Sequence, residues 1–256
     1  MTLVVIVILF SFIFFRQRLR DGYEVFSVRF FPNAQRAFSY GVEHLSSDNP
    51  GAYNIDLASY FFMRTLALDP KTPYLYHQLA RIAFLQGHFG EAMRDINTQI
   101  EMYGTSTPNS YYVRGLIEGY AGDYDAAVRD YGYFLSVDPA NWASANDYAW
   151  VLLKANKPKE AVVATDDALK IHPTNPWLLS TNAVALYEIG DYSAALISAK
   201  KAQTGATYMT ANGWLLAYPG NDPQTAQQGI VTMQKSIQEN IHKIEVAISG
   251  GAIQSN

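Results

Sequence analysis

The chain has 256 residues, of which 49% are hydrophobic, and it carries a formal net charge of −4 and no cysteine. The absence of cysteine excludes disulfides, thiolate zinc sites and lipid attachment to a cysteine. The acidic balance argues against a nucleic-acid partner, because a nucleic-acid-binding surface needs a concentrated basic stripe.

Residues 1–20 are predicted to form a membrane anchor. Residues 3–15 are apolar except for Ser11, and Arg16, Arg18 and Arg20 come directly after them. These 13 residues would rise about 20 Å as a helix, which is less than the ~30 Å of a hydrocarbon core. We expect a single-pass N-terminal anchor, and a buried helix or a cleaved segment are the alternatives. The flanking arginines then place the rest of the chain in the cytoplasm.

Residues 21–33 are predicted to form a juxtamembrane linker. Aromatic residues alternate with charged ones here, at Tyr23, Phe26, Phe30 and Phe31. One interpretation places these rings at the membrane interface, where aromatic side chains are favourable. The other is a strand or helix folded onto the first repeat, and the sequence leaves both open.

A period of about 34 residues runs through residues 34–205. Gly122 is followed 34 residues later by Asn156 and another 34 later by Gly190, and Gly87 precedes it by 35. Such a period is typical of a solenoid of helical hairpins. Each of these residues suits the left-handed backbone that ends a first helix. Small residues that are 34 or 35 positions apart mark the contacts between helices, at Ala92, Ala127, Ala161 and Ala195. Prolines end the second helices, at Pro70, Pro139 and Pro173.

About five hairpins are expected. A divergent first unit has helices over residues 34–45 and 55–68 with a longer loop, as terminal units often do. Four regular units come after it, at about residues 73–107, 108–141, 142–175 and 176–203.

The repeats resemble the tetratricopeptide repeat. The residues that carry the resemblance are Tyr111, Gly115, Gly122-Asp123-Tyr124, Ala127, Tyr131, Leu135 and Asp138-Pro139, and in the last unit Ala183, Leu186-Tyr187, Gly190-Asp191-Tyr192, Ala195, Ala199 and Ala202. The resemblance covers residues 34–203 and implies an all-α, right-handed solenoid. Pro158, Gln99 and Phe134 depart from the pattern, which leaves the local packing at those positions open.

The resemblance also implies a concave groove, lined by the first helices, that binds a peptide or helix of a partner protein. It assigns partner binding to Tyr74, His77, Arg81, Phe84, Asn109, Tyr112, Leu116, Tyr120, Asn146, Trp150, Lys154, Ser180, Val184 and Tyr187. Only Arg81, Asn146 and Lys154 suit the version of this groove that clamps a C-terminal carboxylate, so a chaperone-tail adapter is not expected. The alternative role for each aromatic residue is packing between units.

The C-terminal region should close the solenoid. Residues 206–248 are predicted to form capping helices, because residues 223–248 are richer in Gln, Lys and Glu than the repeats and a solenoid end needs a polar cap. Residues 218–222 form a turn, and Asp222-Pro223 opens a helix as N-cap and first-turn proline. Residues 249–256 are expected to be a frayed tail.

No catalytic motif is present in the sequence. The five histidines are far apart, and neither a G-x-S-x-G elbow nor a glycine-rich phosphate loop occurs. We therefore expect no enzyme activity, cofactor, metal or small-molecule substrate, an enzyme with a cryptic site being the minor alternative. The predicted function is a membrane-anchored scaffold that binds a partner segment in its groove. The main alternative is a permanent structural subunit of a membrane-associated assembly.

Overall fold

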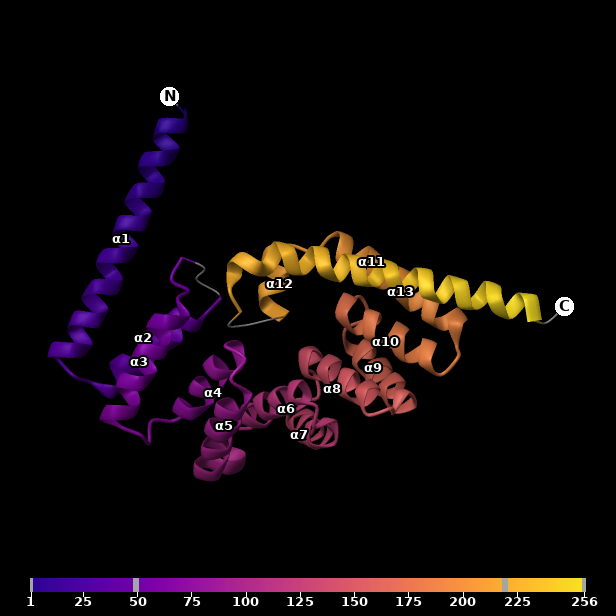
Figure 1. Cartoon of the computed structure of the whole chain (residues 1–256), viewed down its shortest axis with the longest axis horizontal. Coiled ribbons are helices and arrows are strands. Elements are labelled where there is room, and N and C mark those ends of the chain that lie inside the picture. The colour runs from indigo at the N-terminus through magenta and orange to yellow at the C-terminus, as the bar shows by residue number, and fades with distance from the viewer. Residues whose placement is uncertain (1, 48–50, 218–220, 255–256) are drawn as a thin grey trace.

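The structure is a computed structural model that describes residues 2–47, 51–217 and 221–254, with the side chains of residues 2–14, 216 and 251–254 outside the description. The elements that it describes are helices, with no strand among them (Figure 1). They are α1 (Thr2–Phe30), α2 (Ala34–Leu45), α3 (Ile55–Leu68), α4 (Leu75–Leu85), α5 (Phe89–Tyr103), η1 (Gly104–Ser106), α6 (Asn109–Ala121), α7 (Tyr124–Val137), α8 (Trp142–Lys154), α9 (Pro158–Ile171), α10 (Pro176–Glu188), α11 (Tyr192–Thr207), α12 (Ala211–Ala217), η2 (Pro223–Thr225) and α13 (Ala226–Gln254).

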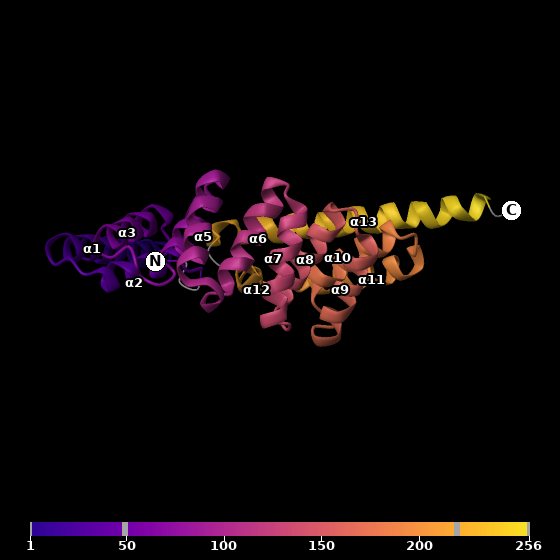
Figure 2. The ribbon, with the colours of Figure 1, turned by 90° about the horizontal axis from the view of Figure 1, so that it is seen from below.

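Helices α2 to α11 form five helical hairpins that stack side by side in chain order (Figures 1 and 2). The all-helical hairpin fold predicted from the period is confirmed. The stack curves, so that the first helices of the later hairpins face the C-terminal helices across a concave side (Figure 1).

The turns inside the hairpins have the predicted chemistry. Gly87, Gly122 and Gly190 have φ values of 77°, 89° and 86°, and Asn156 has a φ of 60°. These left-handed conformations cost glycine little and are tolerated by asparagine. Asp123 then caps α7 by accepting a hydrogen bond from the backbone N–H of Ala126 at 3.2 Å. The sequence therefore specifies where each first helix ends and the next helix begins.

The core is spread along the solenoid in a series of clusters. The four repeated alanines, Ala92, Ala127, Ala161 and Ala195, are fully buried where two helices touch. Gly115 has the same role in α6, because a Cβ there would lie 3.3 Å from the Tyr131 ring. Small residues at these positions let large ones such as Tyr131 fill the space between helices.

Helix α1 runs without a break across the expected boundary between anchor and linker at residue 20. Of the two alternatives for residues 21–33, the structure has the helix folded onto the first hairpin, where Val28 is buried against Ala37 and Phe61. The N-terminal half of α1 projects away from the hairpins (Figure 1). In the part of the chain whose side chains are described, no helix has the length and apolarity to cross a membrane. Most of the apolar run behind the anchor prediction lies outside that part.

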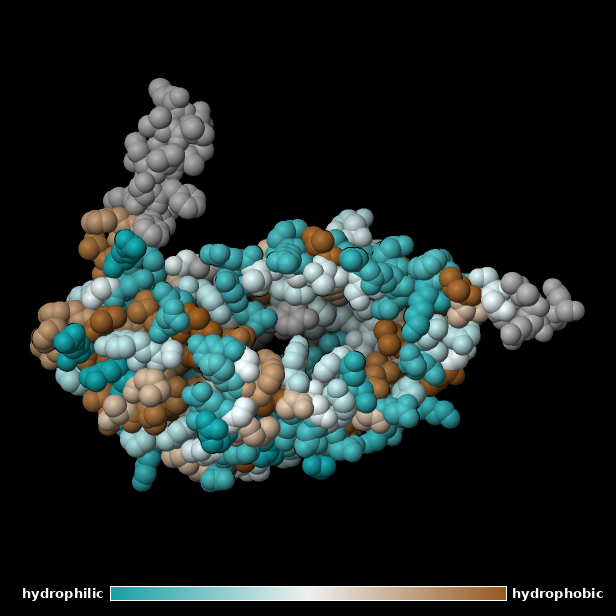
Figure 3. Space-filling model, viewed as in Figure 1, coloured by the Kyte–Doolittle hydropathy of each residue, from teal (hydrophilic) through white to brown (hydrophobic). Residues whose placement is uncertain are grey.

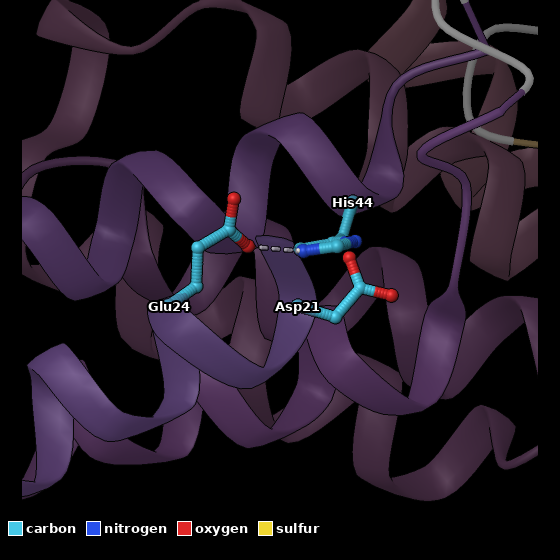
Figure 4. Close-up of side chains that lie close together, drawn as sticks. All are labelled: Asp21, Glu24 and His44. Atoms are coloured by element: carbon cyan, nitrogen blue, oxygen red, sulfur yellow. Dashed lines mark hydrogen bonds and ion pairs between the residues drawn. The ribbon is translucent and has the colours of Figure 1, made fainter. Parts of the chain in front are cut away.

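A buried ionic network fixes α1 to the first hairpin (Figure 4). His44 of α2 faces an acceptor on each side of its ring: Nε2 lies 2.7 Å from Glu24 of α1, and Nδ1 lies 2.7 Å from the Ala52 carbonyl. Burial lowers the pKa of His44, but the bonds to Glu24 and Ala52 outweigh this effect and raise the pKa above its usual value. Arg20 lies 3.3 Å from Glu24 and 3.7 Å from Asp21.

The C-terminal helices α12 and α13 follow the last hairpin, and α13 packs along α11. Ile237, Ile241 and Ile244 of α13 pack on the alanine face of α11. Asp222 caps the 3₁₀ turn η2, and α13 begins directly after it. Residues 249–254, expected as a tail, continue α13, while residues 255–256 lie outside the described residues. Residues 218–220 of the predicted turn also lie outside them.

Candidate binding site in the concave groove

A cavity of about 580 Å³ opens on the concave side of the solenoid. Figure 3 shows the hollow between the C-terminal helices and the hairpins opposite them. Its walls come from the first helices of four hairpins (α4, α6, α8 and α10), from α7, and from the segment around α12. The lining residues are His77, Arg81, Phe84, Leu85, Asn109, Tyr112, Val113, Leu116, Tyr120, Tyr131, Phe134, Asn141, Trp142, Ala143, Asn146, Asp147, Trp150, Trp177, Ala217 and Asn221.

The structure brings together most of the residues assigned to the groove. Nine line the cavity: His77, Arg81, Phe84, Asn109, Tyr112, Leu116, Tyr120, Asn146 and Trp150. Helical spacing explains this result, because residues three or four apart on each first helix share one face. Their role in binding a partner stays a prediction.

Five assigned residues do not line the cavity: Tyr74, Lys154, Ser180, Val184 and Tyr187. Tyr74 precedes α4 with a φ of 62° and packs its ring against His77. Lys154 lies with its ammonium group 5.7 Å from the centre of the Trp150 ring. Tyr187 is covered by Lys243 of α13, whose Nζ lies 4.2 Å from the ring centre. The fold-back of α13 therefore takes up part of the face that the fifth hairpin was expected to offer.

A ladder of tryptophans borders the cavity and was not among the predicted site residues. Trp142, Trp177 and Trp214 come from α8, α10 and α12, with ring centres 5.1 Å and 6.0 Å apart along the series. Trp142 and Trp177 are 35 residues apart, close to the repeat period, so the period itself could have predicted that they share a face.

Polar side chains connect three successive first helices through the cavity. The Tyr112 hydroxyl of α6 donates a hydrogen bond to Asp147 of α8 at 2.9 Å. Asn146 donates to the same carboxylate at a longer 3.4 Å, and its own oxygen accepts a bond from Thr181 of α10 at 2.8 Å. Because these bonds run between neighbouring helices, the network holds the three helices in register.

Asp147 is an acidic group within this aromatic wall. Burial raises the pKa of Asp147 to about 6, although the bonds from Tyr112 and Asn146 work in the opposite direction. No cationic side chain among the described residues forms an ion pair with it. A half-buried carboxylate without a counter-ion favours a partner that brings a cation or a hydrogen-bond donor.

A basic group and a neutral histidine lie at the other end of the cavity, on α4. Burial, with Arg81 nearby, lowers the pKa of His77 to about 3, so the ring is neutral at physiological pH. Its Nδ1 lies 3.2 Å from the Ser110 hydroxyl. Burial lowers the pKa of Arg81 as well, and the phenols of Tyr53 and Tyr112 oppose that shift. The Arg81 guanidinium also donates a hydrogen bond to Gln78 of the same helix at 2.9 Å.

The loop before α3 and the segment before α13 approach each other near Arg81. Burial raises the pKa of Tyr53. The charge of Asp222 adds to this shift and the charge of Arg81 opposes it, so both groups lie within electrostatic range of Tyr53. Ala217 and Asn221 contribute directly to the cavity wall. Figure 1 shows the two ends of the solenoid approaching each other at this point.

Among the described residues, the set nearest to a metal-binding arrangement lies elsewhere, at Asp21, Glu24 and His44, whose ligand atoms are within 4.8 Å of one another. Arg20 already supplies positive charge to both carboxylates. We therefore interpret this set as an ion-pair network.

Comparison with known proteins agrees with this architecture. Residues 112–176 match the family model described as the tetratricopeptide repeat. No curated protein matches the chain. Among solved structures, a crystal structure of MamA is 15% identical with a TM-score of 0.56, covering 69% of this chain and 96% of the other. The structure of MamA MSR-1 is 17% identical with a TM-score of 0.55, and the match covers 67% of this chain and 97% of the other. The structure of MamA AMB-1 is 16% identical with a TM-score of 0.55, and the match covers 70% of this chain and 97% of the other.

The class defined by the hairpins and their concave face is that of helical repeat solenoids. Within this class, residues 112–176 match the tetratricopeptide repeat, and the solenoid is similar in fold to the MamA structures. At these identities, the likeness to the MamA structures shows a shared fold.

Proposed function

We propose that this protein is a membrane-attached scaffold that binds a segment of a partner protein in the concave cavity. The observation that carries the proposal is the cavity of about 580 Å³, walled by aromatic rings from successive first helices. Binding cavities commonly have volumes of ~300–1,000 Å³, apolar walls and a few convergent polar groups. Asp147 supplies such a polar group, and it suits a segment that brings a cation or a hydrogen-bond donor.

Tyr120 is the best candidate anchor for that segment. It is 62% exposed, and its ring packs against Phe84 of α4 at 5.2 Å and Trp150 of α8 at 5.8 Å. Rigid aromatic rings lose little conformational entropy on binding, which makes them effective anchors. Three rings from three successive hairpins therefore form one continuous aromatic surface.

Membrane attachment is proposed through residues 1–20, with the hairpins on the cytoplasmic side. Its support is the apolar run over residues 3–15, with Arg16, Arg18 and Arg20 directly after it. Basic residues on the C-terminal flank of an apolar segment favour cytoplasmic placement of the chain beyond them. The binding cavity would then face proteins at the membrane surface.

Capture from the protein's own membranes tests the binding role. Tyr120→Ala is expected to lower recovery of bound proteins about tenfold or more, because loss of a central aromatic anchor commonly costs about 2 kcal/mol. Tyr120 is a sharper probe than Tyr112, whose ring also packs against Tyr131 and Phe134. Asp167→Ala, an exposed change on α9 at a carboxylate that pairs with Lys170, is the matched control.

Recovery of the same proteins by Tyr120→Ala at the wild-type level, with unchanged helix content by circular dichroism, would contradict the proposal. The second candidate, a permanent structural subunit, predicts a different behaviour. Such a subunit should aggregate when purified without its partners, whereas a reversible binder should remain a monomer. Size-exclusion chromatography with light scattering separates the two.

A further inference from the structure

Helix α1 carries a continuous stripe of large apolar side chains that face solvent. Phe15, Leu19, Tyr23, Phe26 and Phe30 recur at intervals of three or four residues, so they share one face of the helix. Their exposed fractions are 60%, 58%, 66%, 50% and 59%. We refer to these five residues as the aromatic stripe.

The opposite face of α1 is the buried one, although it is partly polar. Glu24, Ser27 and Val28 are buried against the first hairpin, and Glu24 is held there by His44 and Arg20. A surface helix normally turns its apolar face inward and its charged face to water. In α1 this order is inverted, so the aromatic stripe is held outward by the packing of the other face.

Two rings of the stripe, Phe26 and Phe30, contact each other. Phe26 lies 4.6 Å from Phe30, measured between ring centres, and 6.3 Å from Phe31, which is 64% exposed and extends the patch. Exposed apolar patches of this kind mark interaction sites on soluble domains. Figure 3 shows apolar side chains gathered at the foot of α1 and over the neighbouring hairpin.

The charges beside the stripe indicate what covers it. At 3.6 residues per turn, Arg16 lies along one edge of the stripe, and Arg18 and Arg29 lie along the other. All three are exposed, whereas the acidic residues of this stretch, Asp21 and Glu24, face the hairpin. Aromatic rings with arginines on both sides suit the boundary between acyl chains and anionic headgroups.

We propose that the aromatic stripe docks along the surface of a bilayer that contains anionic phospholipid, so that α1 lies in the plane of the interface. This inference rests on the membrane attachment proposed above and assigns its geometry. A second copy of the chain fits the stripe less well, because pairing two such helices would bring arginine-lined edges together.

The continuity of α1 makes the geometry testable. From Phe15 to Phe30 an α-helix rises about 22 Å. In a helix lying flat, all five stripe residues sit at one depth. In an upright helix inserted through residues 3–15, Phe30 lies about 22 Å farther from the hydrocarbon than Phe15 does.

Because the chain has no cysteine, single-cysteine variants of the full protein report this depth directly. Leu19→Cys, Tyr23→Cys, Phe26→Cys and Phe30→Cys would each carry an environment-sensitive fluorophore. The labelled variants would then be added to vesicles of phosphatidylcholine and phosphatidylglycerol that contain a nitroxide-labelled lipid as quencher. Lys170→Cys, on an exposed position of α9, is the matched control. We expect comparable quenching at the four stripe positions and none at position 170.

Quenching that falls steadily from position 19 to position 30 would overturn the flat geometry and leave membrane attachment in place. If the protein co-floats with vesicles but no stripe position is quenched, the docking of the stripe is overturned and membrane attachment is not. A failure to co-float would overturn both the inference and the attachment. Rapid disulfide formation by Phe26→Cys in vesicle-free solution would favour a second copy and likewise overturn it.

The arginines provide a second, independent measurement. Arg16→Glu and Arg29→Glu should each lower affinity for the phosphatidylglycerol vesicles about fivefold or more. Binding to vesicles of phosphatidylcholine alone should change little. Equal losses on both kinds of vesicle would contradict a role for anionic headgroups.

Discussion

The hydroxyl of Tyr112 donates a 2.9 Å hydrogen bond to the Asp147 carboxylate and so joins α6 to α8 in the wall of the concave cavity. The bond connects an aromatic residue of the cavity wall to an acidic group that has no counter-ion among the described residues. Burial raises the pKa of Asp147 to about 6, and the Tyr112 bond holds that pKa down. The ionic state of the cavity therefore depends on this phenol.

Replacing Tyr112 by Phe is expected to raise the pKa of Asp147 above about 6, because the carboxylate loses a hydrogen bond that favours its charged form. A carboxyl-detected NMR titration measures the shift. Since the folded pKa lies above the unfolded value of 3.8, the stability from protonated Asp147 is present below 3.8 and declines as the pH rises through about 6. In the variant this decline should extend to higher pH. Tyr133→Phe is the control, and an unchanged titration of Asp147 would contradict the prediction.

Ala127→Leu and Ala161→Leu are each expected to destabilise the fold by about 1–3 kcal/mol, because both alanines are fully buried where two helices touch. Neighbouring hairpins support one another in a solenoid, so the loss should spread beyond the mutated unit. Urea denaturation followed by circular dichroism measures the change. Ala121→Leu, at an exposed position near the end of α6, should have little effect. Unchanged midpoints in both core variants would mean that these contacts tolerate larger side chains.

Gly229→Ala tests how α12 is held on α13. A Cβ at Gly229 would lie 2.2 Å from the Trp214 ring, which means that the ring or α12 has to move. We expect a cost of about 1–3 kcal/mol and a change in tryptophan fluorescence as the ladder of Trp142, Trp177 and Trp214 is disturbed. Gly132→Ala in α7 is the matched control. A Cβ there meets nothing within 4 Å, so this change should stabilise the helix by ~0.5–1 kcal/mol. Equal effects of the two changes would contradict a tight Trp214–Gly229 contact.

Much of the solenoid could be predicted because its signals are local. A left-handed turn demands glycine or asparagine, and a close helix contact demands alanine or glycine, so both recur at the repeat period. Gly122 and Ala127 show this directly, since each has an equivalent in the neighbouring units with the same conformation or burial. The same period assigns a face to each first helix, which explains why nine of the assigned groove residues line one cavity.

The remainder depends on contacts between distant parts of the chain, which no period encodes. The part of the cavity wall at Ala217 and Asn221 exists because α13 folds back along α11. That fold-back also covers Tyr187, which the resemblance to the tetratricopeptide repeat had assigned to the groove. The inverted orientation of α1 likewise depends on the pairing of Glu24 with His44, twenty residues away. In each case a tertiary contact decides which of two faces is exposed.

The bond between His44 and Glu24 predicts a pH-dependent attachment of α1. Because both ring nitrogens face acceptors at 2.7 Å, the ring satisfies both only as an imidazolium. Its pKa is raised above the ordinary value of 6.5. The stability that it contributes is therefore fully present below about pH 6.5 and is lost as the pH rises through the folded pKa.

Urea denaturation of the wild-type protein between pH 6 and pH 9 should accordingly show a midpoint that falls with increasing pH. In His44→Gln this part of the slope should disappear, because no group is left to release the proton. In Glu24→Gln the loss should shift to lower pH, since the carboxylate no longer raises the pKa of His44. His88→Gln is the matched control, because His88 is exposed and lies 3.9 Å from Glu91. The same pH slope in wild type and His44→Gln would show that His44 does not titrate in this range.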